Sequence, residues 1–97
     1  MPFPQENSFA LTAASVRAHA PSSSGVYGIF SRLQWIYVGE GIDIQRRLLS
    51  HISDTEAGIK RYGPTGFCFE LQPEAVRAAR RDALSKELGA QCAERFL

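Results

Sequence analysis

The segment Gly25–Gly39, with the sequence GVYGIFSRLQWIYVG, decides the fold that this chain is expected to adopt. Its two halves, Gly25–Ser31 and Gln34–Gly39, are both rich in aromatic and β-branched residues, and only Arg32 and Leu33 separate them. Two such runs joined by a short connection predict an antiparallel β-hairpin.

Each strand of this hairpin carries a tyrosine, Tyr27 on the first and Tyr37 on the second. Because side chains alternate between the two faces of a strand, the tyrosines share a face only if paired positions sum to an even number. A register that pairs Tyr27 with Tyr37 meets this condition and requires a tight, bulged turn. We therefore expect both tyrosines on the same face of the sheet.

A short helix is expected before the hairpin. Residues 1–10 contain two prolines and are predicted to form a loosely attached segment, and the domain is predicted to span residues 11–97. The helix itself is predicted over residues 12–19, with Thr12 as its N-cap, and it should end before Pro21.

A second helix is expected directly after the hairpin, with Asp43 as its N-cap. Its apolar residues recur every four positions, as expected of a stripe that packs on a sheet: Ile44, Leu48 and Ile52. Arg47 and His51 are also four residues apart, so both should project at the edge of that stripe.

The rest of the chain predicts a third strand over Phe67–Leu71 and a last helix that runs from Glu74, after Pro73, to about Phe96. At helical spacing, the apolar stripe expected on this helix consists of Val76, Ala79, Ala83, Leu84, Leu88 and Ala90. Glu87 falls within the stripe, so its carboxylate is expected to lean inward. Such breaks in the apolar pattern are enriched at functional sites.

These elements predict one small α/β domain of the α+β type. A central three-stranded antiparallel sheet is flanked by helices, with an extra helix at the N-terminus. The 97 residues suffice for a single domain, and 44% of them are hydrophobic, which excludes a disordered chain.

The composition also narrows the class of protein. No apolar run approaches the roughly 18 residues of a membrane span, and the first residues do not form a secretory signal. Cys68 and Cys92 are far apart and are interpreted as core residues. A cytoplasmic protein with reduced thiols and no membrane association is expected. The net charge of +1 does not by itself indicate a nucleic-acid partner.

Four motifs occur along the chain in a fixed order: Gly25-Val26-Tyr27, Tyr37-Val38-Gly39, an Arg47-x-x-x-His51 spacing, and Glu87 in the last helix. Together they resemble the GIY-YIG nuclease superfamily, with the two tripeptides in the places of GIY and YIG. Valine replaces isoleucine in both, which conserves the shape of the side chain. Each tripeptide alone is weak evidence, whereas the ordered set is a fairly specific signal.

The resemblance implies a metal-dependent endonuclease that hydrolyses phosphodiester bonds in DNA. Glu87 would be the protein ligand of Mg²⁺ or Mn²⁺, since Mg²⁺ commonly takes only one or two carboxylates and completes its shell with water and phosphate oxygens. Arg47 would hold the scissile phosphate. Tyr27 would be the general base, His51 would relay its proton or contact phosphate, and Tyr37 would hydrogen-bond the water or the phosphate.

Four further residues are candidates for contact with the substrate. Gly39 lacks a side chain and permits close approach, and Arg46, Lys60 and Arg80 are basic. Lys60 is one of two residues, with Tyr62, that match a variable basic or hydroxyl-bearing family position. The arginines of the last helix, Arg80 among them, are interpreted first as a solvated helix face and second as a contact with a nucleic-acid backbone.

Structural interpretations compete with each of these assignments. The tyrosines taken alone are more often residues of a half-buried sheet, and the Arg47–His51 pair is more often a polar helix edge. Glu87 would then be an ion-pair partner of Arg80 or Arg77. Two other functions stay open: a catalytically weak nucleic-acid-binding module of the same fold, and a protein-interaction domain. DNA, branched or damaged forms included, is the expected partner, and a second protein or a homodimer is expected to supply specificity.

Overall fold

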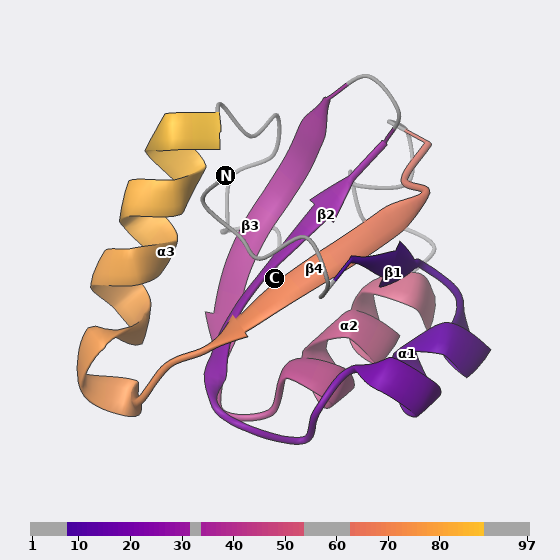
Figure 1. The fold of residues 1–97 in the computed structure, drawn as a ribbon, viewed down its shortest axis with the longest axis horizontal. Coiled ribbons are helices and arrows are strands. Elements are labelled where there is room, and N and C mark those ends of the chain that lie inside the picture. Colours follow the sequence, from indigo (N-terminus) through magenta and orange to yellow (C-terminus); the bar gives the residue numbers. More distant parts are fainter. Residues whose placement is uncertain (1–7, 32–33, 54–62, 89–97) are drawn as a thin grey trace.

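The structure is a computed structural model that describes residues 8–31, 34–53 and 63–88. Within these ranges the elements follow in the order β1 (Phe9–Ala10), α1 (Ala13–His19), β2 (Gly25–Phe30), β3 (Trp35–Gly41), α2 (Ile44–Ser53), β4 (Gly66–Leu71) and α3 (Glu74–Leu88). The helices lie on both sides of one antiparallel sheet (Figure 1). The predicted α/β class is therefore confirmed.

The sheet has four strands in the order β1-β4-β2-β3, and not the three that were predicted. The additional strand lies in the segment expected to be loosely attached, where Phe9 pairs with Phe67 and Ala10 with Gly66. The Phe9 ring packs near Phe67 and stacks on His19 of α1, with ring centroids 5.7 and 4.3 Å apart. Two residues are too few to show a strand period, so the sequence did not reveal this strand. The boundary at residue 10 stays a prediction.

The predicted register of the hairpin is wrong by two residues. Tyr27 pairs with Gly39, and Tyr37 pairs with Ile29, and the register then shifts by one residue between Ile29 and Phe30. An even shift leaves every side chain on its original face. The two tyrosines therefore still share a face, as predicted.

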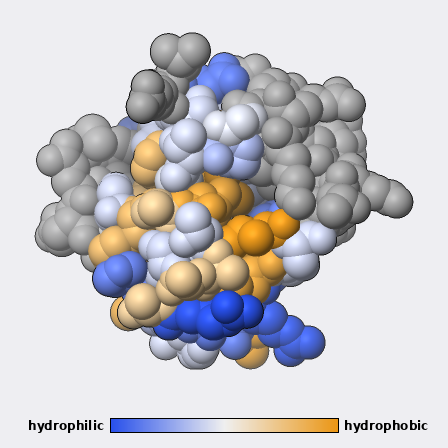
Figure 2. Space-filling model, turned by 90° about the vertical axis from the view of Figure 1, so that its right-hand side faces the viewer, coloured by the Kyte–Doolittle hydropathy of each residue, from blue (hydrophilic) through white to orange (hydrophobic). Residues whose placement is uncertain are grey.

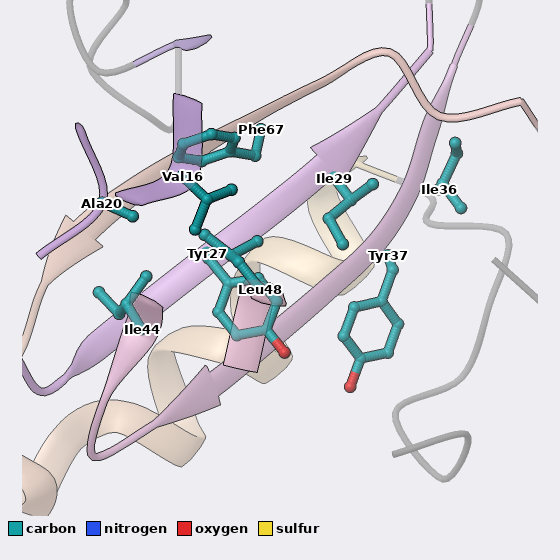
Figure 3. Close-up of a cluster of buried hydrophobic side chains, with 9 residues drawn as sticks. All are labelled: Val16, Ala20, Tyr27, Ile29, Ile36, Tyr37, Ile44, Leu48 and Phe67. Atoms are coloured by element: carbon teal, nitrogen blue, oxygen red, sulfur yellow. The ribbon is translucent and has the colours of Figure 1, made fainter. Parts of the chain in front are cut away.

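That face of the sheet carries the larger core, against α1 and α2 (Figures 1 and 3). Its buried residues come from both helices and three strands: Val16, Ala20, Tyr27, Ile29, Ile36, Tyr37, Ile44, Leu48 and Phe67. The opposite face carries a smaller core toward α3, made of Val26, Val38, Cys68 and Leu84, with Trp35 packed against it. Cys68 is thus a core residue, as predicted, and Cys92 lies outside the described residues.

Local signals in the sequence set where the helices begin. The Thr12 hydroxyl accepts a hydrogen bond from the Ser15 backbone N–H at 3.1 Å, and an Asp43 carboxylate oxygen accepts one from the Arg46 N–H at 3.0 Å. Both N-cap predictions are confirmed. α3 begins directly after Pro73, also as predicted.

The predicted apolar stripe of α3 is wrong. Of its described members Leu84 alone is buried, whereas Val76 is 43% exposed, and Glu87 is exposed instead of leaning inward. The side of α3 that faces the sheet carries Arg77 and Arg81 next to Leu84, and both arginines pair with the Glu40 carboxylate of β3. The interpretation of these arginines as a solvated face is therefore wrong as well.

Two sheet glutamates hold α3 in place. Glu40, at the end of β3, pairs with Arg77 at 2.8 Å and with Arg81 at 3.6 Å. Glu70, near the end of β4, accepts two hydrogen bonds from the Arg80 guanidinium at 2.6 and 2.9 Å. Such two-point arginine–carboxylate pairs fix geometry as well as charge.

The opposite side of the molecule carries β1, α1 and α2. Figure 2 shows hydrophobic residues gathered in the middle of this face, with strongly hydrophilic ones below them. These elements and their flanks contribute the partly buried residues Phe9, Leu11, Leu49 and Ile52, which pack on the larger core. In the described part of the chain, no helix has the length and apolar character needed to cross a bilayer.

The ion pair between Glu70 and Arg80 makes the stability of the fold depend on pH. The hydrogen bonds from Arg80 lower the pKa of Glu70, so this pair stabilises the fold above the ordinary glutamate range and the contribution is lost as the pH falls through the lowered value. We expect Glu70→Gln to lower the free energy of unfolding at neutral pH by about 1 kcal/mol and to reduce the loss on acidification.

Urea denaturation at neutral and acidic pH measures both effects. Glu74→Gln, at an exposed position in the first turn of α3, is the matched control. On acidification it should lose as much unfolding free energy as the wild type does. An equal acid loss in wild type and Glu70→Gln would contradict this assignment.

Candidate active site

Two buried tyrosines form the centre of the candidate site. Tyr27 on β2 and Tyr37 on β3 are both 0% exposed, and their ring centroids are 6.1 Å apart. Figure 3 shows both hydroxyl groups pointing the same way, beyond the hydrophobic cluster. A phenol keeps its apolar ring in a core while its hydroxyl seeks a polar partner, so the partners of these hydroxyls decide what the site can do.

His51, in the last turn of α2, is the hydrogen-bond partner of Tyr27. Its Nε2 lies 2.7 Å from the Tyr27 hydroxyl oxygen, and the side chain is buried. The imidazole ring also lies against both phenol rings, with centroids 5.7 Å from Tyr27 and 5.1 Å from Tyr37. The ring is therefore held in one orientation by packing as well as by the hydrogen bond.

Two glycines make room for this arrangement. A Cβ at Gly39, the cross-strand partner of Tyr27, would lie 2.5 Å from the Tyr27 hydroxyl oxygen. A Cβ at Gly41 would lie 2.9 Å from Cγ of Arg47. The aromatic ring and the arginine stem thus pass directly over backbone that carries no side chain.

Arg47 brings positive charge to the hydroxyl groups. It lies on α2 one turn before His51, and its guanidinium is close enough to Tyr27 to hydrogen-bond the hydroxyl and to lower the Tyr27 pKa. Its Nε, however, is buried without a hydrogen-bond partner. The site therefore contains a cationic donor that no described group of the protein satisfies.

The balance of these effects keeps Tyr27 protonated. Burial raises the pKa of Tyr27 to about 12, against the opposing influence of Arg47 and of a hydrogen bond with Tyr37, and the carboxylate of Glu40 adds to the rise. At neutral pH the group is a phenol that can donate its proton to His51. The Tyr27 hydroxyl is therefore described as a hydrogen-bond donor and not as a phenolate.

Comparison with known proteins gives one clear result. No protein-family model and no curated protein sequence matches the chain. Among solved structures, it is similar to the N-terminal endonuclease domain of UvrC from Thermotoga maritima bound to magnesium, at 21% identity over 78% of this chain and 92% of that one, with a TM-score of 0.66. An asparagine-to-alanine variant of the same domain, bound to its catalytic divalent cation, gives 21% identity over 80% and 93%, and a TM-score of 0.68.

Those structures are described as a GIY-YIG domain. This chain has the GIY-YIG fold. The resemblance drawn from the two tripeptides is thus confirmed at the level of the fold, which places Tyr27 and Tyr37 on the paired strands β2 and β3.

One predicted member of the site lies elsewhere on this GIY-YIG fold. Glu87 is exposed on α3, which packs on the face of the sheet opposite the tyrosines, and its charge acts on Arg80. The carboxylate whose charge does reach Tyr27 is Glu40, which sequence reasoning missed. Its position directly after the Tyr37-Val38-Gly39 tripeptide is the signal that would have found it.

The predicted substrate-contacting residues lie in different parts of the fold, and their role stays a prediction. Gly39 lies under Tyr27, and Arg46 is exposed in the first turn of α2, beside Arg47. Arg80 lies on α3, where Glu70 engages its guanidinium. Lys60 lies outside the described residues.

Among the residues that the structure describes, those at the tyrosines do not fit a cation held by protein carboxylates. The groups gathered there are two phenols, one imidazole and the Arg47 guanidinium, whereas Mg²⁺ selects carboxylate and water oxygens. Glu40, the acid whose charge contributes to the raised pKa of Tyr27, forms ion pairs with Arg77 and Arg81. Within residues 8–31, 34–53 and 63–88, no three His, Cys, Asp or Glu side chains group as metal ligands would.

The close contact between Tyr27 and Gly39 predicts unequal effects at the two glycines. Gly39→Ala forces the Tyr27 hydroxyl away from its position and should lower the free energy of unfolding by about 1–3 kcal/mol, the usual cost of overpacking. Gly41→Ala, its control, meets only the flexible stem of Arg47 and should cost less.

Chemical denaturation of the two variants beside the wild type measures the difference. Equal losses at both glycines would show that the position of Tyr27 does not depend on Gly39.

Proposed function

We propose that this chain is an endonuclease that hydrolyses phosphodiester bonds in DNA, with Tyr27, Tyr37, Arg47 and His51 as its active-site residues. The observation that carries the proposal is the 2.7 Å hydrogen bond between the Tyr27 hydroxyl and Nε2 of His51, beside the charge of Arg47. The fold shared with an endonuclease domain supports it.

The Tyr27–His51 pair supplies a route for a proton. As a water molecule attacks phosphorus, the Tyr27 oxygen accepts the proton of the water while it donates its own proton to Nε2 of His51. This requires the tautomer of His51 that has no hydrogen on Nε2. Because the two transfers are coupled, the site avoids the phenolate that burial disfavours.

Arg47 and Tyr37 act on the phosphate in this proposal. The guanidinium binds non-bridging oxygens and offsets the charge that grows on them during the attack. The Tyr37 hydroxyl, on the same face as Tyr27, orients the water or a phosphate oxygen.

Dependence on Mg²⁺ or Mn²⁺ is part of the proposal, and it rests on the neighbouring structures, which contain a catalytic divalent cation. Such a cation, when bound, offsets charge at the phosphate. The assignment of Glu87 as its ligand has no support from the position of that residue on α3.

The net charge of the protein bears on how tightly it would bind DNA and whether it needs a partner. A net charge of +1 implies modest, salt-sensitive affinity for DNA, so a second protein or a homodimer is proposed to supply specificity. A cytoplasmic location is also part of the proposal.

A second function is favoured by one observation. Glu40 is neutralised by Arg77 and Arg81, and Glu87 is exposed near Arg80, so no uncompensated carboxylate is observed at the tyrosines in the described part of the chain. This arrangement suits a nucleic-acid-binding module of the same fold with little or no turnover.

Cleavage of plasmid and branched DNA at low salt, with Mg²⁺, Mn²⁺ or EDTA, decides between the two functions. We expect nicking by the wild type with either cation. Tyr27→Phe and Arg47→Ala should lower the rate about 10²–10⁴-fold, the usual contribution of a general base or a charge-stabilising group.

Arg17→Ala is the control for Arg47→Ala, because it removes the same charge from an exposed position on α1. DNA binding without cleavage by folded wild type would establish the binding module, and cleavage that survives Tyr27→Phe would exclude Tyr27 as the base.

Glu87→Ala tests the remaining site assignment in the same assay. From the exposed position of Glu87 we expect a loss of less than about tenfold, since the change removes no group that contacts the tyrosines. A loss as large as that of Tyr27→Phe would restore Glu87 as the metal ligand implied by the resemblance.

A further inference from the structure

Glu40 lies between the two glycines that make room for the candidate site. A Cβ would lie 2.5 Å from the Tyr27 hydroxyl oxygen at Gly39, and 2.9 Å from Cγ of Arg47 at Gly41. The backbone of this short segment at the end of β3 is therefore in direct contact with both side chains. A small displacement of the segment changes the positions open to the phenol and to the guanidinium.

The Glu40 side chain is held from the other face of the sheet. Because side chains alternate along a strand, Glu40 lies on the same face as Val38, which packs toward α3. One carboxylate oxygen accepts a hydrogen bond from Nε of Arg77 at 2.8 Å, and the other lies 3.6 Å from a terminal nitrogen of Arg81. Each oxygen of the carboxylate thus has its own arginine on α3.

Arg77 extends this contact to two further strands. Its Nη1 donates a hydrogen bond to the Ser24 hydroxyl at 2.9 Å, and that hydroxyl donates to the Gln72 carbonyl oxygen at 2.6 Å. Ser24 directly precedes β2, and Gln72 directly follows β4. The pair of Glu40 and Arg77 therefore fixes the end of β3 relative to both β2 and β4.

Glu70 is a matched comparison for Glu40. Both glutamates are cross-strand partners of Val26, one on each side of β2, and both bind arginines of α3. Glu70 lies on β4, however, whereas the backbone in contact with the Tyr27 hydroxyl belongs to β3. The two glutamates share a face and a helix and differ in their distance along the sheet from the glycines under the site.

We propose that Glu40 is a positioning residue, which holds the backbone of Gly39–Gly41 beneath the phenol and the guanidinium through its contacts with α3. The geometry of the Tyr27–His51 pair then depends on a helix that packs on the opposite face of the sheet. The effect on cleavage rests on the proposed function, whereas the effect on the geometry of the site does not.

Steady-state cleavage of DNA by three variants tests the proposal. Glu40→Gln and Arg77→Gln break the pair from its two sides and should each lower kcat about 10–100-fold, with KM changed less than about threefold, because a misplacement of about 1 Å can cost 10²-fold. Glu70→Gln breaks the matched pair with Arg80 and should change neither constant more than about threefold. Urea denaturation checks that all three variants are folded under the assay conditions.

The two sides of the pair separate positioning from charge. Burial is the main cause of the raised pKa of Tyr27, and the charge of Glu40 adds to it. Glu40→Gln removes that charge, whereas Arg77→Gln leaves it less compensated, so a role through charge alone predicts opposite changes in kcat. Positioning predicts a loss in both variants, and a loss in the double variant that is smaller than the two single losses combined.

A spectroscopic measurement does not require turnover. In ¹⁵N NMR spectra, the Nε2 signal of His51 should shift in Glu40→Gln and in Arg77→Gln and should stay in place in Glu70→Gln.

The outcomes separate this inference from the proposed function. A wild-type kcat in Glu40→Gln, opposite changes in kcat for Glu40→Gln and Arg77→Gln, or an equal shift of the His51 signal in Glu70→Gln overturns the inference even if the protein cleaves DNA. The expected pattern of His51 shifts, in a protein that cleaves no DNA with either cation, supports the positioning role and contradicts the nuclease.

Discussion

The hydrogen bond between Tyr27 and His51 is the constraint on which the rest of the structure depends. Burying a phenol hydroxyl costs free energy unless it finds a partner, and His51 supplies that partner at 2.7 Å. Reaching it requires the Tyr27 ring to cross β3 at a residue without a side chain, Gly39. The register of the hairpin, the start of α2 and the glycine after Val38 therefore all contribute to bringing the Tyr27 hydroxyl to His51.

Charge is divided between the two faces of the sheet. On the α3 face, Glu40 and Glu70 neutralise the arginines that dock the helix, so these charges are used for structure. On the tyrosine face, Arg47 has no such partner among the described residues, and its buried Nε is unsatisfied. Among the described residues, a guanidinium beside two phenols and an imidazole has chemistry that suits an anion better than a metal ion.

The parts of the fold that the sequence predicted depend on local rules. Alternation along β2 and β3 placed both tyrosines on one face, and an even error in register could not change that result. The caps at Thr12 and Asp43 are set by residues within one turn. The spacing of Arg47 and His51 predicted that they project together, because positions i and i+4 are neighbours on any helix.

The errors at β1 and α3 involve partners distant in the chain, whereas the register error arises within the hairpin. Apolar periodicity favoured the alanine-rich side of α3, but Glu40 and Glu70 draw its other side toward the sheet through contacts 10 to 37 residues away. Rotating the helix in this way turns Glu87 to solvent and engages the arginines. The sequence of one helix does not show which charged residues of other elements it will contact. A carboxylate that interrupts an apolar stripe can therefore mean that the stripe was assigned to the wrong side of the helix, and not that the carboxylate belongs to an active site.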